Sequence, residues 1–140
     1  MWWIYALLSA FFAALTTILA RAGLKDVDSN LATAIRTVVI LLLAWGIVFF
    51  QNTQHELGKI SRTPLFFLIA SGVATGLSWL FYFKALQLGK VTQVAPIDKA
   101  SLALTTVLAV VLLGENLTWK IALGTALVLG GTLVILLDKG

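Results

Sequence analysis

The chain has 140 residues, of which 60% are hydrophobic and only 11% are charged, whereas an ordinary soluble domain is about half apolar and about a quarter charged. A soluble fold of this length cannot hide so much apolar surface, and a disordered chain would be polar, so both classes are excluded. With no Cys and one His, the sequence offers neither a disulfide framework nor a zinc site. The net charge of the chain is +4. In a membrane protein, such an excess of Lys and Arg usually lies in the cytoplasmic loops.

Five apolar stretches follow one another along the chain, each close to the roughly 20 residues that a helix needs to cross the hydrocarbon core. They are continuously apolar and lack the alternation of a transmembrane barrel strand. Helices are therefore favoured, because they satisfy every backbone polar group internally. The sequence predicts an all-α integral membrane protein with a single transmembrane domain over residues 1–140. The predicted helices are 2–20, 31–50, 64–83, 94–113 and 119–137.

Residues typical of helix ends lie at the boundaries of these predicted helices. Trp2 and its aromatic neighbours resemble an interfacial anchor at the start of the first helix. Ser29 or Asn30 is expected to cap the second helix, and Pro64 fits the first turn of the third. Gly114 suits the C-terminal stop of the fourth helix. The short link that follows it predicts an antiparallel hairpin of the last two helices.

Five crossings place the two termini on opposite sides of the membrane. Lys and Arg residues are more numerous on the side of the C-terminus, which the positive-inside rule predicts to be cytoplasmic. The bias is modest, so it fits either a small protein with few charges or one that inserts in both orientations. The richer side carries Arg21, Lys25, Lys84, Lys90 and Lys139, joined by Arg36 and Lys99 within the spans, against Lys59, Arg62 and Lys120 on the other side.

Arg36 lies within the second stretch, roughly 7–8 Å of helix below its predicted start. A guanidinium at this depth can snorkel to the headgroups. Alternatively, it is a cavity cation that binds an anionic group or pairs with Asp98, because ionisable groups in a membrane usually face a protein interior or water. Lysine should replace a snorkelling arginine but not one that makes bidentate bonds.

Asp98 and Lys99 follow Pro96, which can either begin the regular helix or break a longer one. In the simpler interpretation, Asp98 is an acid favoured by the dipole at a helix start, beside a snorkelling lysine. In the functional interpretation, both residues belong to a polar patch that binds substrate or a coupling proton. The sequence leaves both interpretations open.

An aromatic run ends the third stretch. Trp79 and Tyr82 are three residues apart and therefore share a helix face. They fit an aromatic belt at the membrane interface or, alternatively, two walls of a cavity for an organic substrate.

Small residues form stripes along several helices. Gly72 and Gly76 make a GxxxG pattern in the third stretch, and Gly124 and Gly130 lie in the fifth. Such stripes allow helix backbones to approach closely in lipid, where no hydrophobic effect drives helices together. They predict a compact bundle, and one stripe can serve a dimer.

Several segments resemble the EamA domain of the drug/metabolite transporter superfamily, over nearly the whole chain. The resemblance is most specific at the Gly114-Glu115 turn before a last helix that bears glycines, and Arg36 also fits the family pattern. The chain is most similar to the short, single-unit bacterial and archaeal branch. The matching segments are ALQLG at 85–89, VAPIDK at 94–99, LGENLT at 113–118, RAGL at 21–24 and the glycines at 124, 130 and 131.

The resemblance implies a small-molecule secondary transporter, and many members carry two such units in one chain where this sequence has one. Because five is an odd number, a tandem fusion inverts the second unit, and alternating access commonly uses two inverted halves. We therefore expect half of an inverted ten-helix dimer in the cytoplasmic (inner) membrane, paired with a second copy or an oppositely oriented homologue. The expected substrate-binding or coupling residues are Arg36, Asp98, Lys99, Trp79 and Tyr82, and the expected packing residues are Gly72, Gly76, Gly124 and Gly130.

Two other functions fit the same sequence. One is a non-transporting membrane subunit of a larger complex, and the other is a lipid or polyprenyl-lipid flippase with Arg36 beside a phosphate headgroup. The sequence contains no nucleotide-binding motif, catalytic constellation or metal-ligand cluster. We therefore expect no enzyme activity, no metal, no cofactor and no nucleic-acid partner, but a small-molecule substrate and contact with membrane lipid.

Overall fold

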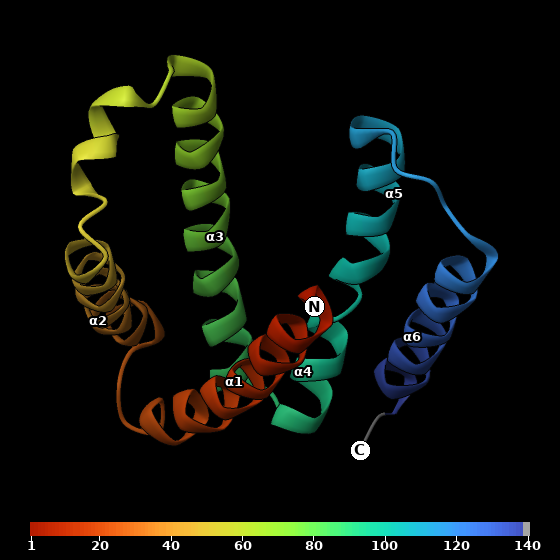
Figure 1. Cartoon of the computed structure of the whole chain (residues 1–140). Coiled ribbons are helices and arrows are strands. Elements are labelled where there is room, and N and C mark those ends of the chain that lie inside the picture. The colour runs from red at the N-terminus through yellow and green to blue at the C-terminus, as the bar shows by residue number, and fades with distance from the viewer. Residues whose placement is uncertain (139–140) are drawn as a thin grey trace. The chain divides into compact units, whose positions relative to one another are not determined.

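The computed structural model describes residues 1–138, and Figure 1 shows that these residues are built from helices. No strand occurs in this range, which confirms the all-α prediction. The elements in chain order are α1 (Trp2–Gly23), α2 (Ser29–Phe50), the short 3-10 helix η1 (Gln54–Lys59), α3 (Arg62–Leu88), α4 (Val91–Asp98), α5 (Ser101–Leu113) and α6 (Trp119–Leu137).

Within residues 1–138, five helical segments are long and apolar enough to cross a membrane, with α4 and α5 together forming the segment Val91–Leu113. The protein is therefore a multi-pass membrane protein. α3 is longer than the predicted 64–83 and runs to Leu88. Its extension consists of good helix formers and ends just before Gly89.

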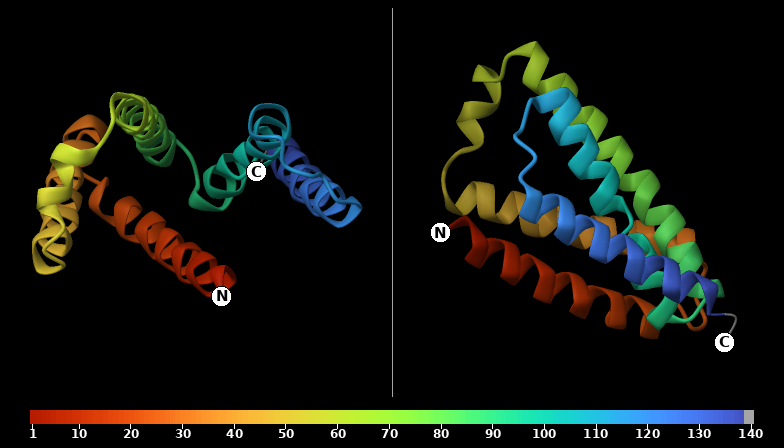
Figure 2. Two further views of the ribbon diagram at one scale, coloured as in Figure 1. Left: turned by 45° about the horizontal axis from the view of Figure 1, so that its top comes forward. Right: turned by 90° about the vertical axis from the view of Figure 1, so that its right-hand side faces the viewer.

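The chain divides into two compact units, Met1–Leu88 and a second that begins at Gly89. In the first unit, α1, α2 and α3 meet at one end and spread toward the other, where η1 links α2 to α3 (Figure 2). The buried side chains of this unit lie where the helices meet: Thr17, Ala20, Leu24, Ser29, Thr33, Phe83 and Leu86. We call this the convergent end.

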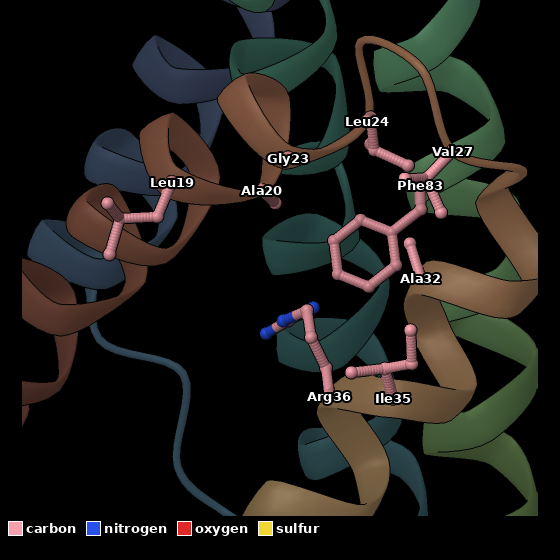
Figure 3. Close-up of a pocket in the computed structure, with 9 residues that line it drawn as sticks. All are labelled: Leu19, Ala20, Gly23, Leu24, Val27, Ala32, Ile35, Arg36 and Phe83. Carbon is pink, nitrogen blue, oxygen red and sulfur yellow. The ribbon is translucent and has the colours of Figure 1, made fainter.

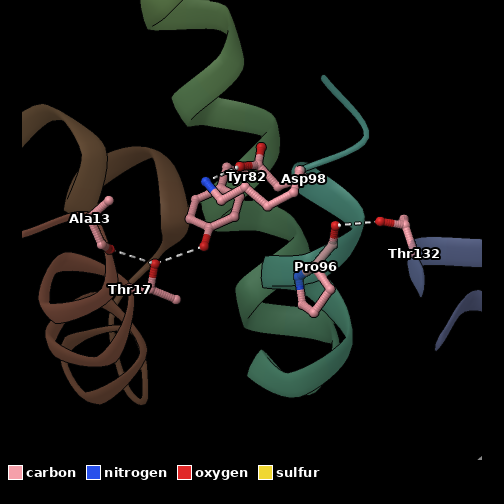
Figure 4. Close-up of polar contacts among 7 residues, drawn as sticks. Ala13, Thr17, Tyr82, Pro96, Asp98 and Thr132 are labelled. Carbon is pink, nitrogen blue, oxygen red and sulfur yellow. Dashed lines mark hydrogen bonds and ion pairs between the residues drawn. The ribbon is translucent and has the colours of Figure 1, made fainter. Parts of the chain in front are cut away.

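In the second unit, both α4 and α5 pack against α6. Thr132 of α6 is buried, and its hydroxyl shares its single proton between the Val128 carbonyl (2.9 Å) and the Pro96 carbonyl of α4 (3.2 Å; Figure 4). The hydroxyls of Thr106 and Thr125 lie 3.5 Å apart between α5 and α6. Hydrogen bonds between helices are a principal source of specific association in lipid.

The fourth membrane segment is interrupted at Lys99 and Ala100, whereas the apolar pattern predicts one helix over 94–113. Around the interruption, the amides of Lys99 and Ala100 bond to carbonyls three residues back, Pro96 and Ile97, at 3.0 Å each. Such bonds tighten the chain to a 3-10 geometry that does not extend far. The proline thus lies inside α4, consistent with the alternative that it interrupts a longer helix.

The helix caps differ in part from those expected. The cap of α2 is Asp28, whose carboxylate accepts from the amides of Asn30 (2.9 Å) and Leu31 (3.2 Å), so the assignment to Ser29 or Asn30 was wrong. A carboxylate one residue earlier reaches the free N–H groups and also complements the helix dipole. Gly114 ends α5 in the left-handed region, with φ of +68°, which confirms the predicted stop.

Candidate functional site

Arg36 projects from the first third of α2 toward α3, about 10 Å of helix from Ser29. Its guanidinium carbon lies 4.3 Å from the ring centre of Phe83 and 5.4 Å from that of Trp79. The two aromatic residues are four apart on α3 and therefore share a face. Phe83 is only 2% exposed, so its ring is held in place next to the guanidinium. A cation–π contact at a partly buried site such as this contributes about 1–2 kcal/mol.

A cavity of about 230 Å³ in the first unit is lined in part by the Arg36 side chain. Figure 3 shows the guanidinium reaching from α2 into the space between α1 and Phe83. Arg36 is the charged residue among those that line the cavity, and the others are apolar residues or glycine. They are Leu19, Ala20 and Gly23 of α1, Leu24 and Val27 of the loop before α2, Ala32 and Ile35 of α2, and Phe83 of α3. We call this the Arg36 cavity.

One nitrogen of Arg36, Nη1, is buried and has no hydrogen-bond partner among residues 1–138. A buried donor without an acceptor costs free energy, and a charged donor costs more than a neutral one. The Phe83 and Trp79 rings beside the guanidinium leave Nη1 without an oxygen acceptor, so this nitrogen remains free to donate. The arrangement can therefore accept an oxygen-bearing ligand at the edge of the guanidinium.

Asp98 and Lys99 lie together at the interruption between α4 and α5. Lys99 Nζ and Asp98 Oδ2 are 3.4 Å apart, and the side chains are 63% and 38% exposed, respectively. An ion pair this exposed contributes little to stability. Both residues therefore remain predicted substrate-binding or coupling residues.

Comparison with known proteins identifies the family. The model of the EamA-like transporter family matches residues 1–137. The chain belongs to this EamA-like transporter family. It is 43% identical over 134 residues to an uncharacterized transporter in the cobO 3′ region of a Sinorhizobium species, an alignment that covers 96% of this chain and 95% of that protein. No solved structure matches the chain. The EamA-like chain is thus a multi-pass membrane transporter.

Tyr82 of the EamA-like chain is held by α1. Its hydroxyl lies 2.9 Å from Thr17 Oγ1, which itself donates to the Ala13 carbonyl at 3.0 Å (Figure 4). Because the Thr17 proton is engaged by Ala13, the Tyr82 hydroxyl is the donor between the two side chains. Tyr82 thus ties α3 to α1, and it is absent from the lining of the Arg36 cavity. Its predicted role as a substrate wall remains a prediction.

Arg21 is a residue whose role the sequence did not reveal. Its Nη1 donates to the carbonyls of Leu86 and of Gln87, the latter at 3.3 Å. These carbonyls belong to the last turn of α3 and have no partner within that helix. The Gln87 side chain in turn donates to the Val27 carbonyl (3.1 Å). A cation at this end also complements the dipole of α3, so Arg21 fastens the convergent end.

The four glycines predicted to pack helices make no close approach within their own units. No atom lies within 4 Å of the position that a Cβ would occupy at Gly72, Gly76, Gly124 or Gly130. Their packing role therefore stays a prediction.

Phe83 is the second residue that sequence reasoning missed. The prediction paired Trp79 with Tyr82, three residues later on the same helix face. Phe83, four residues after Trp79, also shares a face with Trp79. The available signal was Arg36 itself, because a cation within an apolar helix requires a polar or aromatic neighbour.

Proposed function

We propose that this EamA-like protein is a small-molecule secondary transporter that works as one half of an inverted ten-helix pair in the cytoplasmic (inner) membrane. The observation that carries the proposal is the odd number of membrane-crossing segments, five within residues 1–138. An odd number places the two ends of the five-helix chain on opposite sides of the membrane. Two such chains of opposite orientation then supply the inverted halves that alternating access commonly uses.

The relative from the Sinorhizobium species supports a single-unit transporter, because it is covered over 95% of its length by this chain. The partner of the unit is a second copy in the opposite orientation or an oppositely oriented homologue. The modest Lys and Arg bias supports the first option, because a strong bias would fix one orientation. Arg36, Trp79, Tyr82, Asp98 and Lys99 are proposed to bind substrate or the coupling ion.

Orientation tests this proposal directly, because the chain has no Cys and single cysteines can be labelled without background. His55→Cys lies in η1 at one face of the membrane, and Asp26→Cys lies in the loop before α2 at the other; both positions are exposed. Glu115→Cys serves as an internal control, because its loop must label together with that of His55. A membrane-impermeant thiol reagent is applied first to intact cells and then to opened cells.

In a dual-orientation protein, about half of each variant labels in intact cells, which supports an antiparallel homodimer. Labelling of only one face in intact cells contradicts the self-sufficient homodimer. A heterodimer is then tested by co-expressing an oppositely oriented homologue. If neither arrangement transports a solute in liposomes, the transporter proposal is wrong and a non-transporting subunit remains.

A further inference from the structure

We propose that the Arg36 cavity binds a small organic anion, consisting of one carboxylate on a compact apolar body. That this anion is the transported substrate rests on the function proposed above, whereas its binding to the cavity does not.

The charge of the ligand follows from the missing partner of Arg36. Nη1 is buried without an acceptor, and no carboxylate among residues 1–138 lies within 4.0 Å of the Arg36 guanidinium nitrogens. A neutral carbonyl could accept the hydrogen bond but would leave the charge uncompensated in an apolar cavity. A carboxylate supplies two oxygens that match the fork of the guanidinium and also neutralises its charge.

The aromatic contacts orient the guanidinium before a ligand arrives. Phe83 lies 4.3 Å from the guanidinium carbon and is almost fully buried, and Trp79 lies 5.4 Å away. These contacts restrict the side chain, and Nη1 remains available to donate (Figure 3). A preorganised cation loses less conformational entropy on binding, which favours affinity for a small ligand.

The apolar body of the ligand follows from the rest of the lining. All the other lining residues are apolar or glycine, so a second polar group on the ligand would lose its hydration without a partner. The size follows from the cavity volume of about 230 Å³. An apolar cavity of about 150 Å³ holds benzene, so this cavity has room for one ring with a carboxylate.

The probe for this inference is 4-fluorobenzoate, and its neutral counterpart is 4-fluorobenzamide. Binding is followed by fluorine NMR to purified protein in nanodiscs of zwitterionic phosphatidylcholine. We expect Arg36→Gln to weaken 4-fluorobenzoate binding at least about tenfold, since the charge-assisted pair is lost. Arg36→Lys keeps the charge but lacks the two-pronged donor geometry, so its affinity for 4-fluorobenzoate should lie between those of Arg36→Gln and the wild type. Arg62→Gln, at the exposed start of α3, is the matched control and should bind as the wild type does.

A folding control accompanies each variant. Arg36→Gln removes an unpartnered charged donor but also the cation–π contacts with Phe83 and Trp79, so its thermal unfolding without ligand is measured and binding is compared only where the variant is folded. Equal affinity of wild type and a folded Arg36→Gln variant for 4-fluorobenzoate would overturn the inference. Equal affinity of the wild type for 4-fluorobenzamide would overturn it as well.

A lipid headgroup is the competing source of negative charge. If a minority of phosphatidylglycerol in the nanodisc abolishes 4-fluorobenzoate binding to the wild type, the cavity belongs to a lipid phosphate and the inference is wrong. Transport is measured separately, as uptake of 4-fluorobenzoate into proteoliposomes. Binding that depends on Arg36 without any uptake would contradict the proposed function and leave the cavity assignment standing.

Discussion

The hydrogen bond between Thr17 and Tyr82 joins α1 to α3 inside the membrane-spanning part, and a double-mutant cycle can measure it. Thr17→Val removes the acceptor and leaves the Tyr82 hydroxyl as a half-buried donor without a partner, which should cost about 1–2 kcal/mol. Tyr82→Phe should cost less, about 0.5–1 kcal/mol, because the Thr17 proton still reaches the Ala13 carbonyl. The coupling energy should be about 0.6 kcal/mol and no more than about 1.7 kcal/mol.

The assay is unfolding by SDS in mixed micelles, followed by circular dichroism. Thr17→Ser is the matched control, because it keeps the hydroxyl and should retain most of the stability. A coupling energy near zero between two well-folded single variants would refute the tie between the helices. A loss of substrate affinity in Tyr82→Phe without a change in stability would point instead to the predicted wall of the substrate site.

Three further predictions concern the ends of helices and use the same unfolding assay unless stated. Asp28→Ala should lower stability by about 1 kcal/mol through loss of the α2 cap, whereas Asn30→Ala should have little effect. Gly114→Ala should cost about 1 kcal/mol because φ is +68° there, and an unchanged stability would show that the turn relaxes. Arg21→Gln should speed amide hydrogen exchange in the last turn of α3 by about tenfold, and unchanged exchange would contradict its capping role.

The membrane spans could be predicted from the sequence because length and apolar composition determine them. The position of Arg36 within a span was equally visible. Trp79 was predicted to share its site, but the contact with Phe83 was not visible, because Phe83 reaches Arg36 only through the packing of α2 against α3. Sequence periodicity describes one helix at a time and carries no information on which helices adjoin.

The same limit explains the other differences. Thr17 and Tyr82 are 65 residues apart, and so are Arg21 and Leu86, so no local pattern links them. At the interruption of the fourth segment, the Pro96 carbonyl accepts from Thr132, a residue 36 positions away that no local pattern could identify. The error at the α2 cap was different in kind, because Asp28, Ser29 and Asn30 are all good capping residues and only geometry distinguishes them.

The polar ties of the first unit are concentrated at its convergent end, where Arg21 and Gln87 fasten α3 to α1 and to the loop before α2. At the far end η1 joins α2 to α3, whereas α1 lacks polar ties there within residues 1–88, so α1 can tilt about the convergent end. A helix of 22 residues is about 33 Å long, so a tilt of about 10° about the convergent end displaces its far end by about 6 Å. Small adjustments of a few hydrogen bonds at one membrane face would therefore change the opening at the opposite face by more than the width of a water molecule.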